Sequence, residues 1–70
     1  MSELDEQQKK ILKALSEMED PAGCKDIGEK ADIPWRTVMG KLRGLKSDGY
    51  VDSPVKSKYV IMEKGRNTVV

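Results

Sequence analysis

Three helix-breaking interruptions divide this chain of 70 residues into short segments. They are Asp20-Pro21-Ala22-Gly23, Asp32-Ile33-Pro34 and Asp48-Gly49. Proline disfavours helical geometry in the residue before it, and glycine readily adopts the left-handed conformation that ends many helices. A chain of this length forms one small domain, which buries only about 60% of the surface exposed by its unfolded chain. We therefore expect a single domain over residues 1–70, built from short elements.

The segment before the first interruption, Asp5–Glu19, has the pattern of an amphipathic helix. Its apolar residues recur at the spacing of one helical face: Ile11, Leu12, Leu15 and Met18. Asp5 with Gln8 fits a capping box, and so does Ser2 with Asp5. The sequence predicts a helix here and leaves open two starts that lie one turn apart.

Two more helices are predicted between the interruptions. Cys24, Ile27 and Ala31 follow one another at helical spacing, which predicts a short helix over 24–31. The segment Pro34–Ser47 is the third helix, and Pro34 suits its first turn because the missing N–H would have no partner there. Its apolar stripe consists of Trp35, Val38, Leu42 and Leu45.

The remainder of the chain predicts a β-hairpin. Tyr50–Ser53 and Lys58–Met62 are rich in β-branched and aromatic residues, and Pro54–Ser57 joins them as a turn. Two strands alone are marginally stable, so the hairpin must pack on the helices. Residues 63–70 show too little periodicity for an assignment, and their β-branched end is a poor helix former.

The composition argues against an enzyme. The chain has no histidine and one cysteine, so it lacks the commonest general base and cannot form a disulfide or a thiolate-rich zinc site. Cys24 is interpreted as a small hydrophobic residue at a helix start. The acidic cluster of Glu17, Glu19 and Asp20 is interpreted as solvated surface. We expect no enzymatic activity, no metal and no cofactor.

The chain also lacks the marks of a membrane or secreted protein. No run of about 18 apolar residues is present. The start, Met1 to Asp5, has neither the basic nor the apolar region of a secretory signal. We therefore expect a cytoplasmic protein with no membrane partner.

A near-neutral net charge of +1 conceals an asymmetry between the two halves. Residues 1–35 contain five basic and nine acidic side chains, a balance of −4, whereas residues 36–70 contain eight and three, a balance of +5. No acidic residue lies between Pro34 and Ser47. If these charges converge on one face, that face would attract a polyanion.

The order of these elements resembles that of winged helix-turn-helix domains. The segments Ile11–Leu15, Lys25–Ala31 and Asp48–Val51 are similar to that family, and Glu63–Arg66 resembles the ending found in many prokaryotic repressors. The resemblance implies an α+β fold in which a three-helix bundle is followed by a two-stranded antiparallel hairpin, the wing. It further implies that the third helix enters the major groove of DNA while the wing lies on the adjacent backbone or minor groove.

The resemblance and a helical wheel together suggest the residues that contact DNA. Opposite the apolar stripe of the third helix lie Arg36, Gly40, Arg43 and Ser47. Thr37 and Gly44 flank that face, with Lys41 and Lys46 nearer its edges, and the wing adds Lys56 and Lys58. We expect a transcriptional regulator that binds double-stranded DNA with helix 34–47 in the major groove and wing 53–59 on the backbone. Its expected DNA-binding residues are Arg36, Thr37, Gly40, Lys41, Arg43, Gly44, Ser47, Lys56 and Lys58.

An alternative function is a winged-helix module that binds a protein partner and no DNA. Gly40 and Gly44 lie one turn apart, and a pair of small residues at this spacing lets another helix approach closely. Trp35 is interpreted as part of the core, and contact with a sugar or base is its alternative. Tyr50 and Tyr59 are interpreted as core or cross-strand packing. Monomer and homodimer both remain open.

Overall fold

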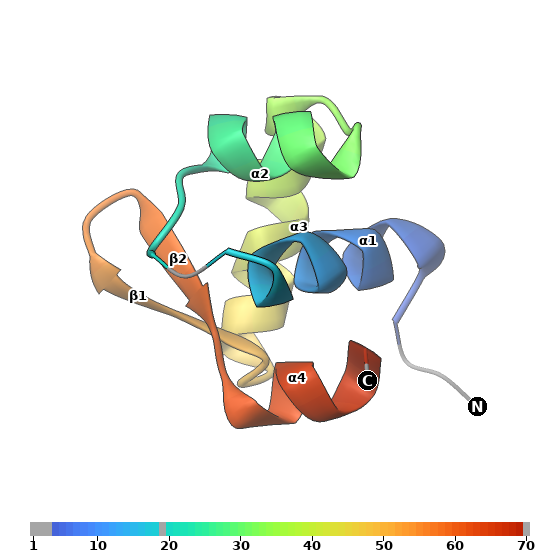
Figure 1. The fold of residues 1–70 in the computed structure, drawn as a ribbon, viewed down its shortest axis with the longest axis vertical. Helices are drawn as coiled ribbons and strands as arrows, with labels where there is room; N and C mark the ends of the chain where they lie inside the picture. The colour runs from blue at the N-terminus through green and yellow to red at the C-terminus, as the bar shows by residue number, and fades with distance from the viewer. Residues whose placement is uncertain (1–3, 19, 70) are drawn as a thin grey trace.

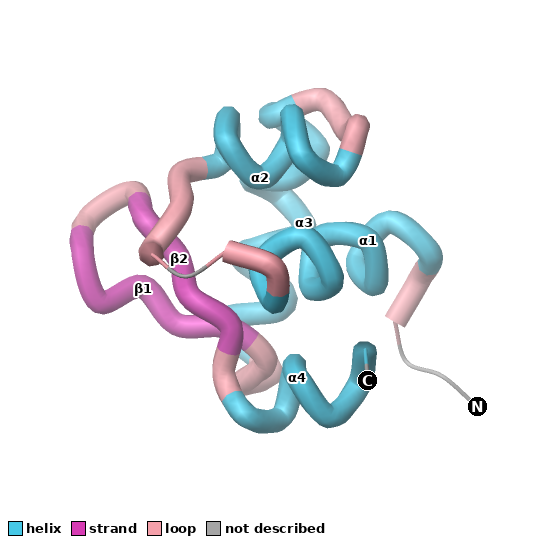
Figure 2. The backbone as a smooth tube through the Cα atoms, in the orientation of Figure 1, coloured by secondary structure: helices cyan, strands magenta, loops and turns pink. Residues whose placement is uncertain are grey.

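The computed structural model describes residues 4–18 and 20–69. In this part of the chain the elements are α1 (Glu6–Ser16), α2 (Cys24–Ala31), α3 (Trp35–Ser47), β1 (Val51–Val55), β2 (Lys58–Ile61) and α4 (Glu63–Val69). Helix α3 runs behind α1, α2 crosses near the start of α3, and the hairpin and α4 lie to the side and below (Figures 1 and 2). The chain has the winged-helix fold, which confirms the predicted α+β class and adds a fourth helix that was not predicted.

Helix α1 begins at the later of the two possible starts. The carboxylate of Asp5 accepts a hydrogen bond from the Gln8 N–H at 2.7 Å, and the Gln8 side chain accepts one from the Asp5 N–H at 3.0 Å. The helix ends at Ser16, so its predicted end was wrong. The N–H of Glu17 bonds to the carbonyl three residues before it, at 3.2 Å, and this tighter spacing closes the last turn. Ser2 and Glu19 lie outside the described residues.

The turn between α2 and α3 depends on a close backbone approach. Helix α2 has the predicted bounds, and Asp32 ends it with a left-handed φ of 59°. A Cβ on Gly28 would lie 2.5 Å from the Ile33 carbonyl oxygen and 3.4 Å from Trp35 Cα, so only glycine fits without a shift. Pro34 caps α3 instead of lying in its first turn. This contact sets how α2 meets the start of α3.

The core lies between the inner faces of the helices and the base of the hairpin. Its fully buried side chains are Ile11, Leu12, Leu15, Ile27, Val38, Leu42 and Leu45. Tyr50 is buried and Tyr59 is half-buried against this core, as predicted. The interpretation of Trp35 as a core residue was wrong, because its side chain is 41% exposed. Trp35 is the first residue of α3, and Ile33 fills the end of the core in its place.

The hairpin is tighter than predicted. Strand β1 continues through Pro54 to Val55, and the turn comprises only Lys56 and Ser57, the latter with a φ of 66°. Pairing is irregular between Asp52 and Val55, where Pro54 has no N–H to donate.

A further contact of the hairpin involves a residue of the first helix-breaking interruption. Ala22 forms an antiparallel bridge to Tyr59, with N–H to carbonyl distances of 3.0 and 2.8 Å. The segment before α2 is thereby attached to β2.

Helix α4 was missed because contacts far away in sequence stabilise it. A Cβ on Gly65 would lie 2.6 Å from the Tyr50 carbonyl oxygen and 2.8 Å from Ile61 Cγ1, so the helix packs closely on the base of the hairpin. Val69 packs against the core. Packing of this kind outweighs the weak intrinsic helix propensity of a short segment.

Candidate nucleic-acid interface

The outer face of α3 carries the side chains expected to contact DNA. Arg36, Gly40, Arg43 and Ser47 are all exposed, whereas Val38, Leu42 and Leu45 of the opposite face are fully buried. The ion pairs in the described part of the chain are Lys30 with Glu17 and Lys41 with Asp5. Neither pair involves Arg36 or Arg43, which are both exposed and have no acidic partner among residues 4–18 and 20–69.

One edge of this face is tied to α1. Lys41 is half-buried, and its ammonium group bonds to the Asp5 carboxylate at the start of α1. This bond and the Gln8 N–H hold the pKa of Asp5 below its ordinary value. Thr37 is half-buried and Gly44 is exposed on the same side of α3. A phosphate contact by Lys41 would require the Asp5 pair to open.

The other edge contains Trp35, and two cations lie near its ring. The Nζ atom of Lys25 lies 5.9 Å from the centroid of the indole ring, and Cζ of Arg36 lies 5.6 Å from it. Lys25 belongs to α2 and to the acidic half of the sequence, so the charge count did not single it out. The position of Lys25 in the first turn of the helix before α3 could have identified it from the sequence. In helix-turn-helix proteins, the helix that precedes the recognition helix crosses the DNA backbone.

The tip of the hairpin lies beside the start of α2. A Cβ on Gly23, the N-cap of α2, would lie 3.5 Å from the Ser57 carbonyl oxygen. Figure 2 shows the hairpin turn close to the loop that enters α2. Lys56 and Lys58 are exposed at this tip. We call the surface formed by the outer face of α3, Lys25 and the hairpin tip the basic face; its cations are Lys25, Arg36, Arg43, Lys46, Lys56 and Lys58.

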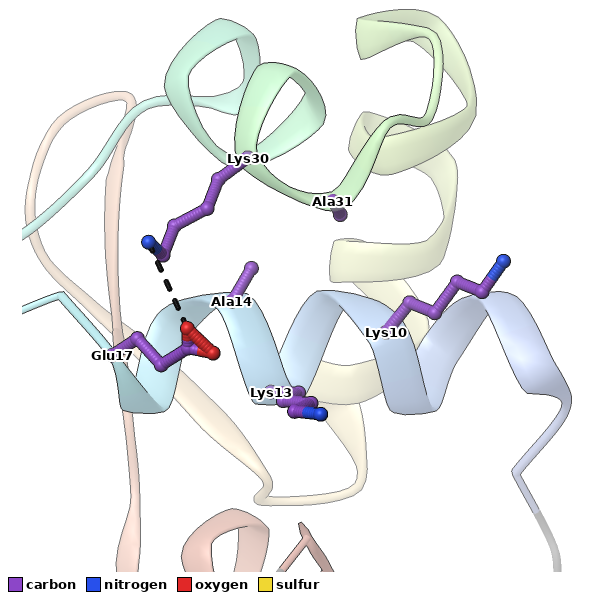
Figure 3. Close-up of a pocket in the computed structure, with 6 residues that line it drawn as sticks. All are labelled: Lys10, Lys13, Ala14, Glu17, Lys30 and Ala31. Atoms are coloured by element: carbon purple, nitrogen blue, oxygen red, sulfur yellow. Dashed lines mark ion pairs between the residues drawn. The ribbon is translucent and has the colours of Figure 1, made fainter.

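A second group of lysines lines a groove of about 240 Å³ between α1 and α2 (Figure 3). Lys30 Nζ is 3.7 Å from the carboxylate of Glu17 across its mouth. Lys10 extends away from the pair formed by Lys30 and Glu17 (Figure 3). One cation of this groove is already paired with an acidic residue that also lines it, so the groove is less suited than the basic face to a polyanion.

Cys24 and the acidic side chains are the other groups that could react or hold a metal ion. Cys24 is half-buried, and this burial raises the pKa of its thiol, which disfavours the reactive thiolate. Residues 4–18 and 20–69 contain no group of three or more Cys, Asp or Glu side chains placed to hold a metal ion. Among the helices of those residues, none has the length and apolar character needed to cross a bilayer.

Comparison with known proteins supports the fold. No protein-family model and no curated protein matches the sequence. The fold is similar to a solved structure of Bordetella bronchiseptica BpsR, a protein whose DNA binding is regulated by 6-hydroxynicotinic acid. The TM-score is 0.85 and the identity 24%, over 97% of this chain and 51% of BpsR. This chain therefore spans about half the length of BpsR and shares its fold.

Proposed function

We propose that this chain binds duplex DNA as the DNA-binding domain of a transcriptional regulator. In this proposal α3 enters the major groove and hairpin residues 53–59 lie on the adjacent backbone. The observation that carries the proposal is the basic face: the outer side of α3 has no acidic residue, Lys25 of α2 lies near Trp35 at the start of α3, and the hairpin tip lies beside the start of α2. The similar fold of BpsR, a protein that binds DNA, supports it.

The chemistry of the basic face suits both kinds of DNA contact. Arginine can pair with guanine through two hydrogen bonds, and Arg36 lies near the start of α3, the part of a recognition helix that contacts base edges. Lys25, Lys56 and Lys58 come from the flanking elements and suit phosphates. The proposed contacts on α3 are Arg36, Thr37, Gly40, Lys41, Arg43, Gly44 and Ser47.

Gly40 gives α3 room to approach DNA closely. A Cβ at this position would meet no atom within 4 Å. The backbone of α3 is therefore uncovered at this position. Glycine in the middle of a helix costs about 1 kcal/mol relative to alanine, and here it leaves a surface that DNA can approach closely.

Salt dependence of binding tests the proposal. Neutralising about four to six phosphates predicts a slope of about −4 to −5 when log affinity is plotted against log salt concentration. A fluorescent duplex titrated with the full chain at several salt concentrations measures this slope. Trp35 is the only tryptophan and lies on the basic face, so its emission provides a second, label-free signal. A slope near zero would contradict duplex binding.

The competing function is capture of a protein partner through the surface around Gly40 and Gly44. Leucine at Gly40 would project into open space, so the Gly40→Leu variant should fold normally. If it loses a protein partner in a pull-down and keeps its DNA affinity, the protein-interaction function is supported. If its DNA affinity falls in parallel with those of Arg36→Ala and Arg43→Ala, duplex binding is supported instead.

A further inference from the structure

Two large apolar side chains are exposed on the basic face. Trp35 is 41% exposed and Met39, one helical turn further along α3, is 38% exposed. Residues four apart on a helix are neighbours on its surface, so the two side chains form one apolar edge. Neither belongs to the buried stripe of α3, which consists of Val38, Leu42 and Leu45.

The charges around this apolar edge favour a nucleic acid as its partner. Lys25 and Arg36 both lie within 6 Å of the centre of the Trp35 ring. An apolar protein surface that covered Trp35 would also remove these two charges from water, which is unfavourable unless acidic groups pair with them. A DNA groove would supply partners for both, with phosphates for Lys25 and the acceptor atoms of a base edge for Arg36.

We infer that Trp35 and Met39 contact the C5-methyl groups of thymine in the major groove. This inference rests on the proposed function and specifies the bases that α3 prefers. The thymine methyl is the apolar group that the bases present in the major groove, and apolar side chains contact it there. Trp35 is the first residue of α3, and the first residues of a recognition helix are the ones that contact base edges.

A pair of duplexes that differ only in this methyl group tests the inference. The first is an alternating A·T duplex, and the second is the same duplex with deoxyuridine in place of thymidine. Burying one methyl-sized group should make the wild-type chain bind the thymidine duplex about fourfold more tightly. The affinities are measured at one salt concentration at which both duplexes bind.

Alanine variants assign the preference to the two side chains. Trp35→Ala and Met39→Ala should each bring the affinity ratio toward one, whereas Met39→Leu, which keeps an apolar side chain, should retain most of it. Met62→Ala is the matched control, because Met62 is also 41% exposed but lies between β2 and α4. Its ratio should equal that of the wild type.

The outcomes separate the inference from the proposed function. Salt-dependent binding with equal affinity for both duplexes overturns the inference and leaves duplex binding intact. Methyl preference that persists in both alanine variants also overturns it, because the contact would then lie elsewhere. Absence of binding to either duplex, at low salt and with correctly folded protein, overturns the proposed function and the inference together.

Discussion

Helices α1 and α3 are alike on the inside and different on the outside. Each contributes fully buried leucines to the same core, and each carries several basic residues. On α1, however, the lysines are accompanied by Glu6 in the first turn and Glu17 at the end, whereas α3 contains no acidic residue. A count of cations therefore does not identify a surface for a polyanion. The arrangement of acids among them does.

The two helices also differ in the apolar side chains that they leave exposed. Trp35 and Met39 are exposed on α3, whereas the large apolar residues of α1 are buried. Substitutions on the inner faces of α1 and α3 should thus lower stability to a similar extent. Substitutions on the outer face of α3 should lower DNA affinity more than those on the outer face of α1.

The largest effect is expected from the shared inner side. Leu12→Ala and Leu42→Ala should each lower the free energy of unfolding by about 2–5 kcal/mol, because both side chains are fully buried and truncation leaves a cavity. Urea denaturation followed by circular dichroism measures both losses. A large loss in one variant and almost none in the other would mean that the two helices do not share one core.

The next largest effect should distinguish the outer faces. Arg36→Ala should lower affinity for a preferred duplex by about 1–3 kcal/mol and relax specificity at one base pair, through loss of a two-bond contact. Arg43→Ala tests the same role two helical turns further along α3. Lys9→Ala and Lys13→Ala are matched controls that remove the same charge from the exposed surface of α1, and they should change affinity little. Equal, sequence-independent losses from all four variants would show that only total charge matters.

A smaller effect is expected from the hairpin. Lys56→Ala and Lys58→Ala should weaken binding to all sequences about equally, because the proposed function assigns both lysines to phosphates and not to bases. Each should flatten the salt slope by about one unit. Titrations against two unrelated duplexes at several salt concentrations measure both properties. A change in sequence preference would show that the hairpin contacts bases and not only the DNA backbone.

The smallest effect concerns the ion pair between Asp5, the N-cap of α1, and Lys41 of α3. The pKa of Asp5 is lowered in the folded chain, so its ionised form favours folding above the pKa of the unfolded chain. This contribution is lost as the pH falls through the lower, folded pKa. Asp5→Asn keeps a capping side chain but removes the charge opposite Lys41. Its stability should therefore fall less than that of the wild type between about pH 5 and pH 2. Identical acid profiles in denaturation experiments would show that the pair contributes nothing.

Periodic patterns were sufficient for most of the fold. The buried stripe of Val38, Leu42 and Leu45 and the exposed positions of Arg36 and Arg43 follow from the 3.6-residue period of a helix, which is a property of the local backbone. The bounds of α2 follow from the breakers on either side of it. These features depend on residues that are close in sequence, so the sequence alone predicted them.

Contacts between distant residues decided the features that the patterns missed. Helix α4 forms because Gly65 lets it pack against Tyr50 and Ile61, and no periodicity within residues 63–70 reports that contact. Trp35 has the spacing of a core residue, yet Ile33 occupies the end of the core and leaves the indole outside. Lys25 joins the basic face because α2 crosses the start of α3. Helical spacing specifies the direction of a side chain around its own axis, but whether that direction meets core, solvent or a neighbouring charge depends on how the elements pack.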